Sequence, residues 1–417
     1  MCSPARLQAA LNQWHTGRSL TSWFGHRVHF AGQADSITRP MKLLRLCAKN
    51  YRSLQNAIVG VNALNLFIGA NAAGKSNILD ALRFLQEGAS DRDFASAVRG
   101  RGGILNLAWK GASAEEVELT VELASDGDTI EWSLRLIRDG YNFIVEEKVD
   151  KLERGAPPTT LLEARAGSGW WWSGEKHQKV ELKQSPTICA LAAAAADASF
   201  PARELADFIR TWGFFDPHPF LLRRDWSGTE FRRFDPYGRN LGETLFALER
   251  SNPEGFRQIV EATQDVLGLA TKIEPRQSDD RFYFLQREPG LEYPVHQMGV
   301  SSGTLRMLAL MTALFSESDA NLIGIEEPEN YVHPTAIASF VEYIRESEQR
   351  VQFIITTHSP LLLDYLGDPA AVRIVTRGAD GATSVSSEAH GESIREALHQ
   401  SGFGLGAFYE TQGFGAN

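Results

Sequence analysis

The fold is decided by Gly69-Ala-Asn-Ala-Ala-Gly74-Lys75-Ser76, a glycine-bounded loop between the apolar run Leu64–Ile68 and the helically spaced segment Asn77–Leu85. A strand, a glycine loop and a helix in this order are the usual surroundings of a phosphate-binding P-loop. The glycines allow tight turns, so that backbone N–H groups converge on phosphate oxygens, and the helix presents its positive N-terminus to the same anion. The loop therefore predicts nucleotide binding, and a purely structural glycine turn is the alternative.

Each residue type in this loop has an expected task. Lys75 would lie between the outer phosphates of ATP, and the hydroxyl of Ser76 would hold Mg²⁺. The backbone of the loop and the first helical turn would contact the phosphates. The residues expected to contact the nucleotide here are Gly69, Ala70, Asn71, Ala72, Ala73, Gly74, Lys75, Ser76 and Asn77.

Two other apolar runs end in polar side chains. Leu322–Ile325 leads directly into Glu326-Glu327-Pro-Glu, and Phe353–Thr357 leads into His358. Buried strands of a parallel sheet carry their ends to the edge where nucleotides bind. One carboxylate would hold the Mg²⁺ shell and the next would orient the attacking water, while the imidazole would bond the γ-phosphate or that water. Taken alone, acids or a histidine after an apolar strand often have no such role.

A fourth segment is Val300-Ser-Ser-Gly-Thr304, which precedes a helix expected to start at Leu305. Serine and glycine at a helix N-terminus form either an ordinary cap or an anion-binding site. By itself, the pattern favours the cap.

The composition limits the classes of protein. With 417 residues, 43% of them hydrophobic and 23% charged, the chain is typical of a globular protein. No apolar run approaches the roughly 18 residues of a membrane helix, so no membrane partner is expected. The net charge of −10 gives no overall basic footprint for nucleic acid. A local basic patch stays open beside the alternative that its arginines are solvated or paired; they are Arg223, Arg224, Arg232 and Arg233.

The cysteines lie far apart and match no metal-binding spacing; they are Cys2, Cys47 and Cys189. This usage suggests a reducing compartment, and we expect a cytoplasmic protein. Residues 1–40 hold four arginines, no lysine and one acid, and are treated as an extension of uncertain order. The strand pattern begins at Met41.

The remaining pattern predicts the coarse layout. A hairpin is expected from residues 116–123 and 129–137, a strand over 141–149, and a loop over 151–168. Trp170, Trp171 and Trp172 suggest a buried or interface aromatic cluster, with a base-stacking platform as the alternative. Residues 187–212 and 241–267 are predicted to be largely helical, without a long coiled coil. Apolar strands alternate with helices towards the C-terminus, which predicts a parallel sheet covered on both faces, with a late hairpin over 373–376 and 383–386.

Four segments together resemble the ABC-type ATPases of the OLD/RecF-like class, within the broader AAA/ABC ATPases, related to the heads of chromosome-structural ATPases. They are FIGANAAGKSNILDAL from residue 67, SSGTLRMLAL from 301, LIGIEEPENYVHP from 322 and FIITTHSP from 353. The resemblance implies an α/β P-loop NTPase: an ABC-type head with a mixed sheet, an antiparallel β subdomain and an inserted helical arm or lid. The head would comprise residues 41–100 and 291–417, and the insertion residues 101–290.

The resemblance also implies roles for individual residues. Ser301, Ser302 and Gly303 correspond to the ABC signature, which in this class contacts the ATP held by the opposite protomer, so a homodimer is expected. Glu326 takes the Walker B metal position, where many ABC proteins have aspartate. Glu327 matches the catalytic base.

Three further residues carry weaker or more general implications. His358 matches the switch histidine and, with Lys75, completes the catalytic set. Tyr51 or Arg52 could stack on adenine. His333 is expected to have a structural or interface role.

These implications make an ATP-hydrolysing switch the expected function, in DNA repair or anti-phage defence. DNA and a separate nuclease or toxin effector would be partners. Only 59 residues follow His358, too few for the Toprim nuclease domain of OLD nucleases, so nuclease activity is not expected in this chain. The alternatives are an ATP-dependent scaffold with little turnover and, less favoured by the SSGT signature, the ATPase subunit of a transporter.

Overall fold

The structure of the chain is a computed structural model, which describes residues 41–111, 115–125, 127–227, 233–316, 319–386, 390–401 and 404–412. The expected extension over 1–40 and Arg232 of the basic patch lie outside these described residues. No helix in the described ranges is long and apolar enough to cross a membrane.

The P-loop strand lies inside a six-stranded sheet whose order is β10-β15-β16-β3-β17-β18. The first five strands run parallel and the last pair is antiparallel, which confirms the predicted parallel core, the mixed sheet and the late hairpin. Side chains of β3 and β16 are buried throughout, as expected for strands covered on both faces. The strands are β3 (Leu64–Ile68), β10 (Gly213–Phe215), β15 (Leu322–Glu326), β16 (Gln352–Thr357), β17 (Val372–Arg377) and β18 (Thr383–Val385).

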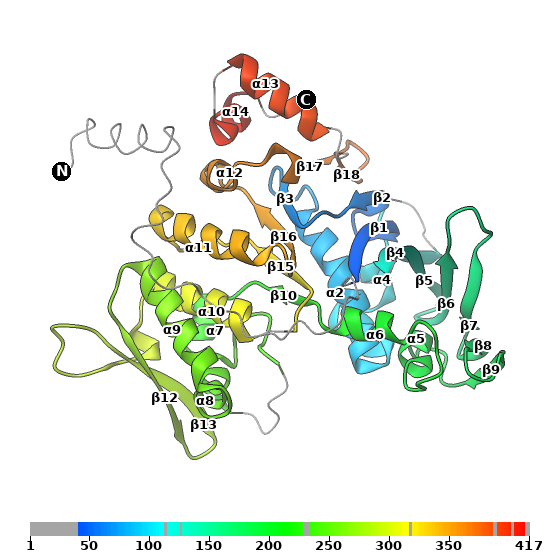
Figure 1. The fold of residues 1–417 in the computed structure, drawn as a ribbon, viewed down its shortest axis with the longest axis horizontal. Helices are drawn as coiled ribbons and strands as arrows, with labels where there is room; N and C mark the ends of the chain where they lie inside the picture. The colour runs from blue at the N-terminus through cyan, green and yellow to red at the C-terminus, as the bar shows by residue number, and fades with distance from the viewer. Residues whose placement is uncertain are drawn as a thin grey trace. The chain divides into compact units, whose positions relative to one another are not determined.

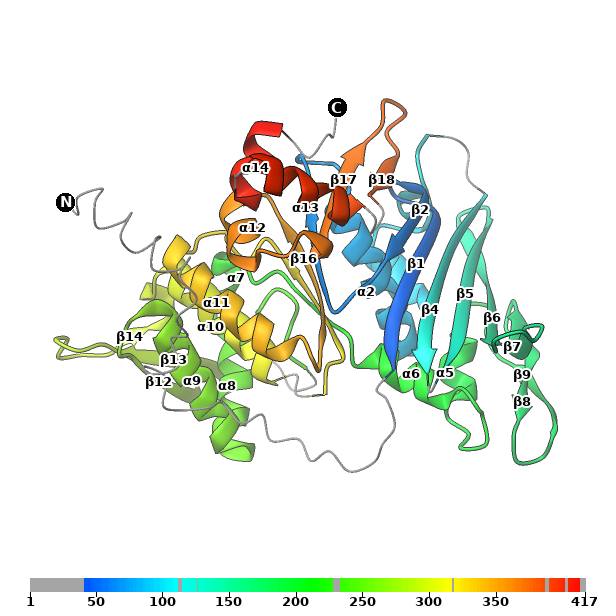
Figure 2. The ribbon, with the colours of Figure 1, turned by 45° about the horizontal axis from the view of Figure 1, so that its top comes forward.

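Helices cover both faces of this sheet. α2 lies on one side, and α10 and α11 lie on the other (Figures 1 and 2). α10 is almost wholly buried because apolar residues occupy nearly every position after its first turn. The helices packed around the core sheet are α2 (Lys75–Asp91), α6 (Arg203–Arg210), α7 (Pro219–Leu222), α9 (Pro253–Leu267), α10 (Ser302–Ser316), α11 (Pro334–Ser347), α12 (Pro360–Leu366), α13 (His390–Ser401) and α14 (Leu405–Gln412), with the 3₁₀ turn η2 (Pro369–Ala371).

An eight-stranded antiparallel sheet forms a second layer, with the order β2-β1-β4-β5-β6-β7-β8-β9. Burial alternates along β5, as the period-2 pattern predicted, and the β4–β5 hairpin is confirmed. The strands are β1 (Lys42–Tyr51), β2 (Leu54–Gly60), β4 (Glu116–Ser125), β5 (Asp128–Asp139), β6 (Asn142–Leu152), β7 (Thr159–Arg165), β8 (Ser168–Ser173) and β9 (Gln178–Lys183).

Two local predictions in this sheet have clear outcomes. The loop expected over residues 151–168 is wrong, because β7 lies within it and pairs with β6 and β8. Gly155 and both prolines of this segment lie in the turn before β7, and Gly167 lies in the turn after it. Among the tryptophans, Trp171 is buried and packs edge-on against Phe200, which agrees with an aromatic cluster.

Residues 101–290 contribute strands to more than one sheet. β4 continues the sheet of β1 and β2, and β10 joins the core sheet beside β15. Strands β5 to β9 of the antiparallel sheet, several helices and most of a small third sheet make up the rest of this region. The remaining elements are α3 (Phe94–Gly100), α4 (Ile104–Leu107), α5 (Ala190–Ala194), α8 (Leu241–Ser251), β11 (Trp226–Ser227), β12 (Lys272–Ser278), β13 (Arg281–Arg287), β14 (Val295–His296) and η1 (Gln297–Gly299).

Candidate functional site

The C-terminal ends of three neighbouring strands bring the predicted residues together. β15, β16 and β3 lie side by side in parallel register, with Glu326 opposite Thr356 and Thr357 opposite Ile68. The P-loop follows β3, the acidic pair follows β15, and His358 follows β16. Their side chains therefore meet at one edge of the sheet, where open α/β sheets bind ligands.

The P-loop backbone depends on glycine at two points. Gly74 has a φ of 109°, a conformation that side chains other than hydrogen rarely allow. At Gly69, a Cβ atom would lie 2.0 Å from the carbonyl oxygen of Val375 on the neighbouring strand. Ala72 also adopts a left-handed conformation, with a φ of 61°. Asn71 and Ala72 are exposed, whereas Ala73 is buried.

Lys75 is the centre of the site and is only 5% exposed. Its Nζ donates to the carbonyl oxygens of Gly69 at 2.9 Å and Ala70 at 3.1 Å, and lies 2.7 Å from Nε2 of His358. Burial lowers the pKa of Lys75, while the carboxylates of Glu327, Glu329 and Glu326 oppose that effect. The ammonium group is thus held among oxygen and nitrogen atoms that a phosphate would share or replace.

Ser76 and Glu326 form the oxygen pair expected to hold the metal. Oγ of Ser76 donates to Oε2 of Glu326 at 2.6 Å. Burial raises the pKa of Glu326, the Ser76 bond opposes this, and the nearby carboxylates of Asp216, Glu327 and Asp80 raise it further. A hydroxyl and a carboxylate in contact are hard oxygen donors of the kind that Mg²⁺ takes beside substrate phosphates, so these residues fit that ion.

Glu327 and His358 form the second half of the site. Oε1 of Glu327 lies 3.3 Å from Nε2 of His358, and Oε2 accepts from the Asn330 amide at 2.6 Å. Glu327 has a φ of 42°, a left-handed conformation that costs a non-glycine residue about 1–2 kcal/mol. Its N–H donates to the carbonyl of Thr356 at 2.9 Å, which holds the strained residue at the end of the sheet.

Two protein families and one known protein are similar in sequence to parts of this chain. The family described as "AAA ATPase domain" matches residues 41–198, and the family described as "AAA domain, putative AbiEii toxin, Type IV TA system" matches residues 194–364. The DNA replication and repair protein RecF of Natranaerobius thermophilus is 45% identical over 53 residues, which is 12% of this chain and 14% of that protein. The chain therefore spans only a small part of that relative's length.

One solved structure supports the fold, and a second is similar at a lower score. A structure of an Smc head bound to the C-winged helix domain of ScpA has a TM-score of 0.51 at 15% identity, covering 82% of this chain and 96% of that one. A Smc head domain with an extended coiled coil, derived from Pyrococcus furiosus, has a TM-score of 0.48 at 13% identity, covering 86% and 100%. The first shows an SMC-head-like ATPase fold. Two models of AAA-type ATPase domains thus match adjoining parts of the chain, over residues 41–198 and 194–364.

Two residues of the candidate site, Glu329 and Arg306, lie outside the set predicted from the sequence. Glu329 accepts from the Thr357 hydroxyl at 2.7 Å and from the His358 N–H at 3.0 Å, so it fixes the strand end that carries the histidine. It is the third acid of the predicted acidic run, and its position there was the available signal. Its contacts come from a different strand, which local sequence cannot show.

Arg306 is a second residue that was not predicted, and it is fully buried. Its Nη2 donates to the carbonyls of Glu326 and Glu327, each at 2.8 Å, and Nη1 donates to the carbonyl of Pro217. Asp216, just after β10, lies 3.3 Å from the same guanidinium. Arg306 therefore ties α10 and β10 to the backbone of the acidic pair.

Ser301, Ser302 and Gly303, which correspond to the ABC signature, make their contacts away from the P-loop. Oγ of Ser301 accepts from the N–H of Thr304 at 3.1 Å, so the predicted cap is present. Arg223 donates to the Ser302 hydroxyl at 3.0 Å, and at Gly303 a Cβ would lie 2.8 Å from the carbonyl of Tyr331. Among hydrogen bonds between described residues, none joins Ser301, Ser302 or Gly303 to the P-loop.

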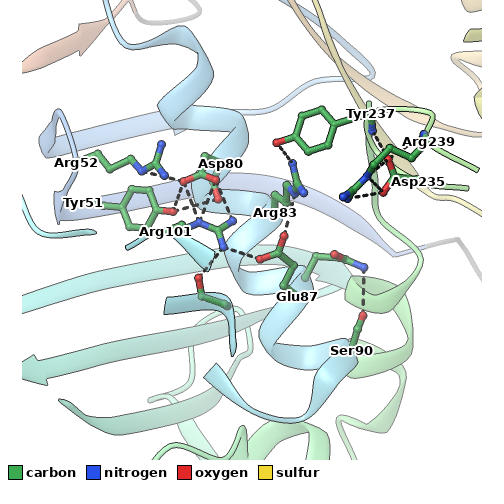
Figure 3. A network of polar contacts seen from close by, with 12 residues as sticks. Tyr51, Arg52, Asp80, Arg83, Glu87, Ser90, Arg101, Asp235, Tyr237 and Arg239 are labelled. Carbon is green, nitrogen blue, oxygen red and sulfur yellow. Dashed lines mark hydrogen bonds and ion pairs between the residues drawn. The ribbon is translucent and has the colours of Figure 1, made fainter. Parts of the chain in front are cut away.

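A polar network extends from the metal end of the site along α2 (Figure 3). Asp80 lies one turn after Ser76, and its carboxylate contacts Arg52 at 3.1 Å and Arg101 at 2.9 Å. Tyr51 is fully buried and donates to Asp80, so it does not offer the free ring that adenine stacking requires.

The network borders a cavity of about 360 Å³ that also reaches Ser76 and Glu326. Arg83 contacts Glu87 at 2.9 Å and the Tyr237 hydroxyl at 3.2 Å at the far end. Asp80, Arg83 and Glu87 are spaced three or four positions apart on α2. Their partners Arg52, Arg101 and Tyr237 come from other segments of the chain. His333, for which a structural or interface role was expected, caps α11 by accepting from the N–H of Thr335.

Proposed function

We propose that this chain binds ATP with Mg²⁺ and hydrolyses it to ADP and phosphate as an ABC-type switch. The observation that carries the proposal is the contact of Lys75, Glu327 and His358: Nε2 of the histidine lies 2.7 Å from the lysine and 3.3 Å from the glutamate. A cation, a carboxylate and an imidazole from three segments share one point at the nucleotide-binding edge. That combination suits a γ-phosphate and an attacking water.

Each residue would have a defined part in the reaction. Amides of the P-loop and the Lys75 ammonium would bind the phosphates, Lys75 exchanging its contacts with Gly69 and Ala70 for phosphate oxygens. Glu327 would accept a hydrogen bond from the water that attacks the γ-phosphorus, and His358 would hold the transferred phosphoryl oxygens. Mg²⁺, held by Ser76 and Glu326, would neutralise charge on the phosphates. The bond from γ-phosphorus to the bridging oxygen breaks, and ADP leaves.

Apolar exposure around the signature supports a homodimer. Phe220, Met298 and Tyr331 are 59%, 63% and 59% exposed. They lie near one another because Arg223, the C-cap residue of α7, donates to the Val300 carbonyl and to the Ser302 hydroxyl, while the Tyr331 carbonyl lies close to Gly303. Exposed aromatic and methionine side chains of this kind are enriched in protein interfaces. A second copy seated here would bring Ser301, Ser302 and Gly303 to the partner's nucleotide.

For the biological process we propose DNA repair or anti-phage defence with a separate nuclease or toxin effector. The RecF relative and the toxin–antitoxin description of one matching family support these two settings. DNA is the expected nucleic-acid partner, although the chain's net charge is −10. Its contacts would then depend on local arginines such as Arg223 and Arg224.

The test is phosphate release by the wild type and by Glu327→Gln, with and without DNA. Loss of the carboxylate should lower kcat at least about 100-fold while leaving the dissociation constant for MgATP within about threefold, because binding rests on the P-loop. Glu342→Gln, on the exposed surface of α11, is the matched control. Wild-type turnover by Glu327→Gln would refute its role. If the wild-type protein binds MgATP tightly but releases no phosphate, the chain is an ATP-dependent scaffold instead.

A further inference from the structure

A chain of side-chain hydrogen bonds runs beneath the P-loop and ends on the late hairpin. The Asn77 amide lies 2.6 Å from Oγ of Ser53, which lies 2.7 Å from Oγ1 of Thr383, which lies 2.8 Å from the carbonyl oxygen of Ala73. The chain joins the first turn of α2, the β1–β2 turn, β18 and the P-loop itself. Thr383 and Ala73 are 310 positions apart in sequence.

The direction of these bonds follows from the atoms at the two ends. The carbonyl of Ala73 can only accept, so Thr383 must give it its single hydroxyl proton. Ser53 must then donate to Thr383, and the Asn77 Nδ2 donates to Ser53. Both hydroxyl protons in this series of hydrogen bonds are therefore committed, and hydrogen bonds aligned in series strengthen one another.

The hairpin makes two more contacts with the same region. Nη1 of Arg377 donates to the carbonyl of Ala72 at 3.2 Å, and the N–H of Thr383 donates to the carbonyl of Ser53 at 2.8 Å. Close packing is part of the arrangement, because a Cβ at Gly74 would lie 2.0 Å from Oγ1 of Thr383. Arg377 and Thr383 of the hairpin region thus hold two consecutive P-loop carbonyls, those of Ala72 and Ala73.

We propose that the β17–β18 hairpin positions the P-loop for phosphate binding, with Thr383 as the main positioning residue and Arg377 as its neighbour. The N–H of Ala73 donates within the loop to the carbonyl of Ala70 at 3.2 Å. Holding the carbonyl of Ala73 towards the hairpin turns the amide of Gly74, in the same peptide group, the opposite way, towards the phosphates. This proposal rests on ATP binding by the P-loop. It makes affinity for a triphosphate depend on a segment that lies after the switch histidine and outside the recognised motifs.

The test compares Thr383→Val with Thr383→Ser by calorimetric titration with MgATP and with pyrophosphate, and by thermal unfolding. Valine keeps the shape but leaves the buried Ala73 carbonyl without its donor. We expect Thr383→Val to raise the dissociation constants for both ligands about tenfold. Thr383→Ser keeps the hydroxyl and should stay within about twofold of the wild type.

Val385→Ala is the matched control. It weakens the packing of the same strand but removes none of the hydrogen bonds that connect Asn77, Ser53, Thr383 and Ala73. It should lower the unfolding midpoint and leave both dissociation constants unchanged. Wild-type affinity in Thr383→Val, or equal weakening by Val385→Ala, would overturn the positioning role. If the wild type itself binds neither ligand, the proposed ATP binding fails, and that outcome differs from failure of the hairpin alone.

Discussion

Replacing Arg306 with methionine tests whether the acidic pair is positioned from behind. The guanidinium is 1% exposed and donates to the carbonyls of Pro217, Glu326 and Glu327. Methionine fills much of the volume but donates nothing. A hydrogen bond from a charged donor contributes about 1.5–3 kcal/mol. Because neighbouring losses are not additive, we expect the free energy of unfolding to fall by about 4 kcal/mol.

The same substitution should lower ATP turnover. Glu327 holds a left-handed backbone conformation with a φ of 42°, and Arg306 binds its carbonyl at 2.8 Å. Without that bond the residue can relax, and a displacement of about 1 Å at a reacting group costs about 100-fold in rate. We therefore expect kcat for phosphate release to fall about 100-fold, with a smaller change in the dissociation constant for MgATP.

Arg345→Met provides the comparison. Arg345 also donates to two carbonyls, those of Tyr365 at 2.6 Å and Leu366 at 2.9 Å, but it lies on α11 and is 38% exposed. This variant should lose about 1 kcal/mol of stability and keep its turnover. Denaturant unfolding and phosphate release at a temperature where each variant is folded give both quantities. A kcat for Arg306→Met within about threefold of the wild type would refute the reasoning; if that variant does not fold, Arg306→Lys, which keeps the charge but not the fork, takes its place.

Two predictions concern groups outside the reaction. Burial raises the pKa of Glu147 from 4.5 to about 7 in the folded state, so its contribution is present below the unfolded pKa and is lost as pH rises through about 7. Relative to Glu147→Gln, the wild type should lose about 2.5 kcal/mol of unfolding free energy between about pH 5 and 8 in denaturant titrations, and a pH-independent difference would show that its N–H donors keep it ionised. Asp80→Asn removes the shared partner of Arg52 and Arg101 and should cost about 3 kcal/mol by the same measurement, whereas a loss below about 0.5 kcal/mol would show that Glu87 alone suffices for Arg101.

Local patterns were sufficient for much of the fold and for the central residues of the candidate site. The strand at Leu64–Ile68, the hairpin of β4 and β5, and the helix α10 all followed from apolar periodicity. β7 was missed because a turn rich in glycine and proline precedes it and masks a short strand of seven residues. The insertion over residues 101–290 stays a prediction. The pairing of β4 and β10 with strands from other segments was not predicted, because periodicity does not specify a strand's partner.

By itself, the sequence determined which residues are candidates for the chemistry, because a glycine loop and the polar ends of buried strands are properties of a few consecutive residues. Lys75, Glu326 and His358 could be named from such segments alone. Only the tertiary structure decided what holds them: Arg306 behind the acidic pair, and Thr383 beneath the P-loop. Those contacts join side chains to backbone carbonyls far away in the chain, and a carbonyl is present at every residue, so no pattern of residue types can mark which one is bound.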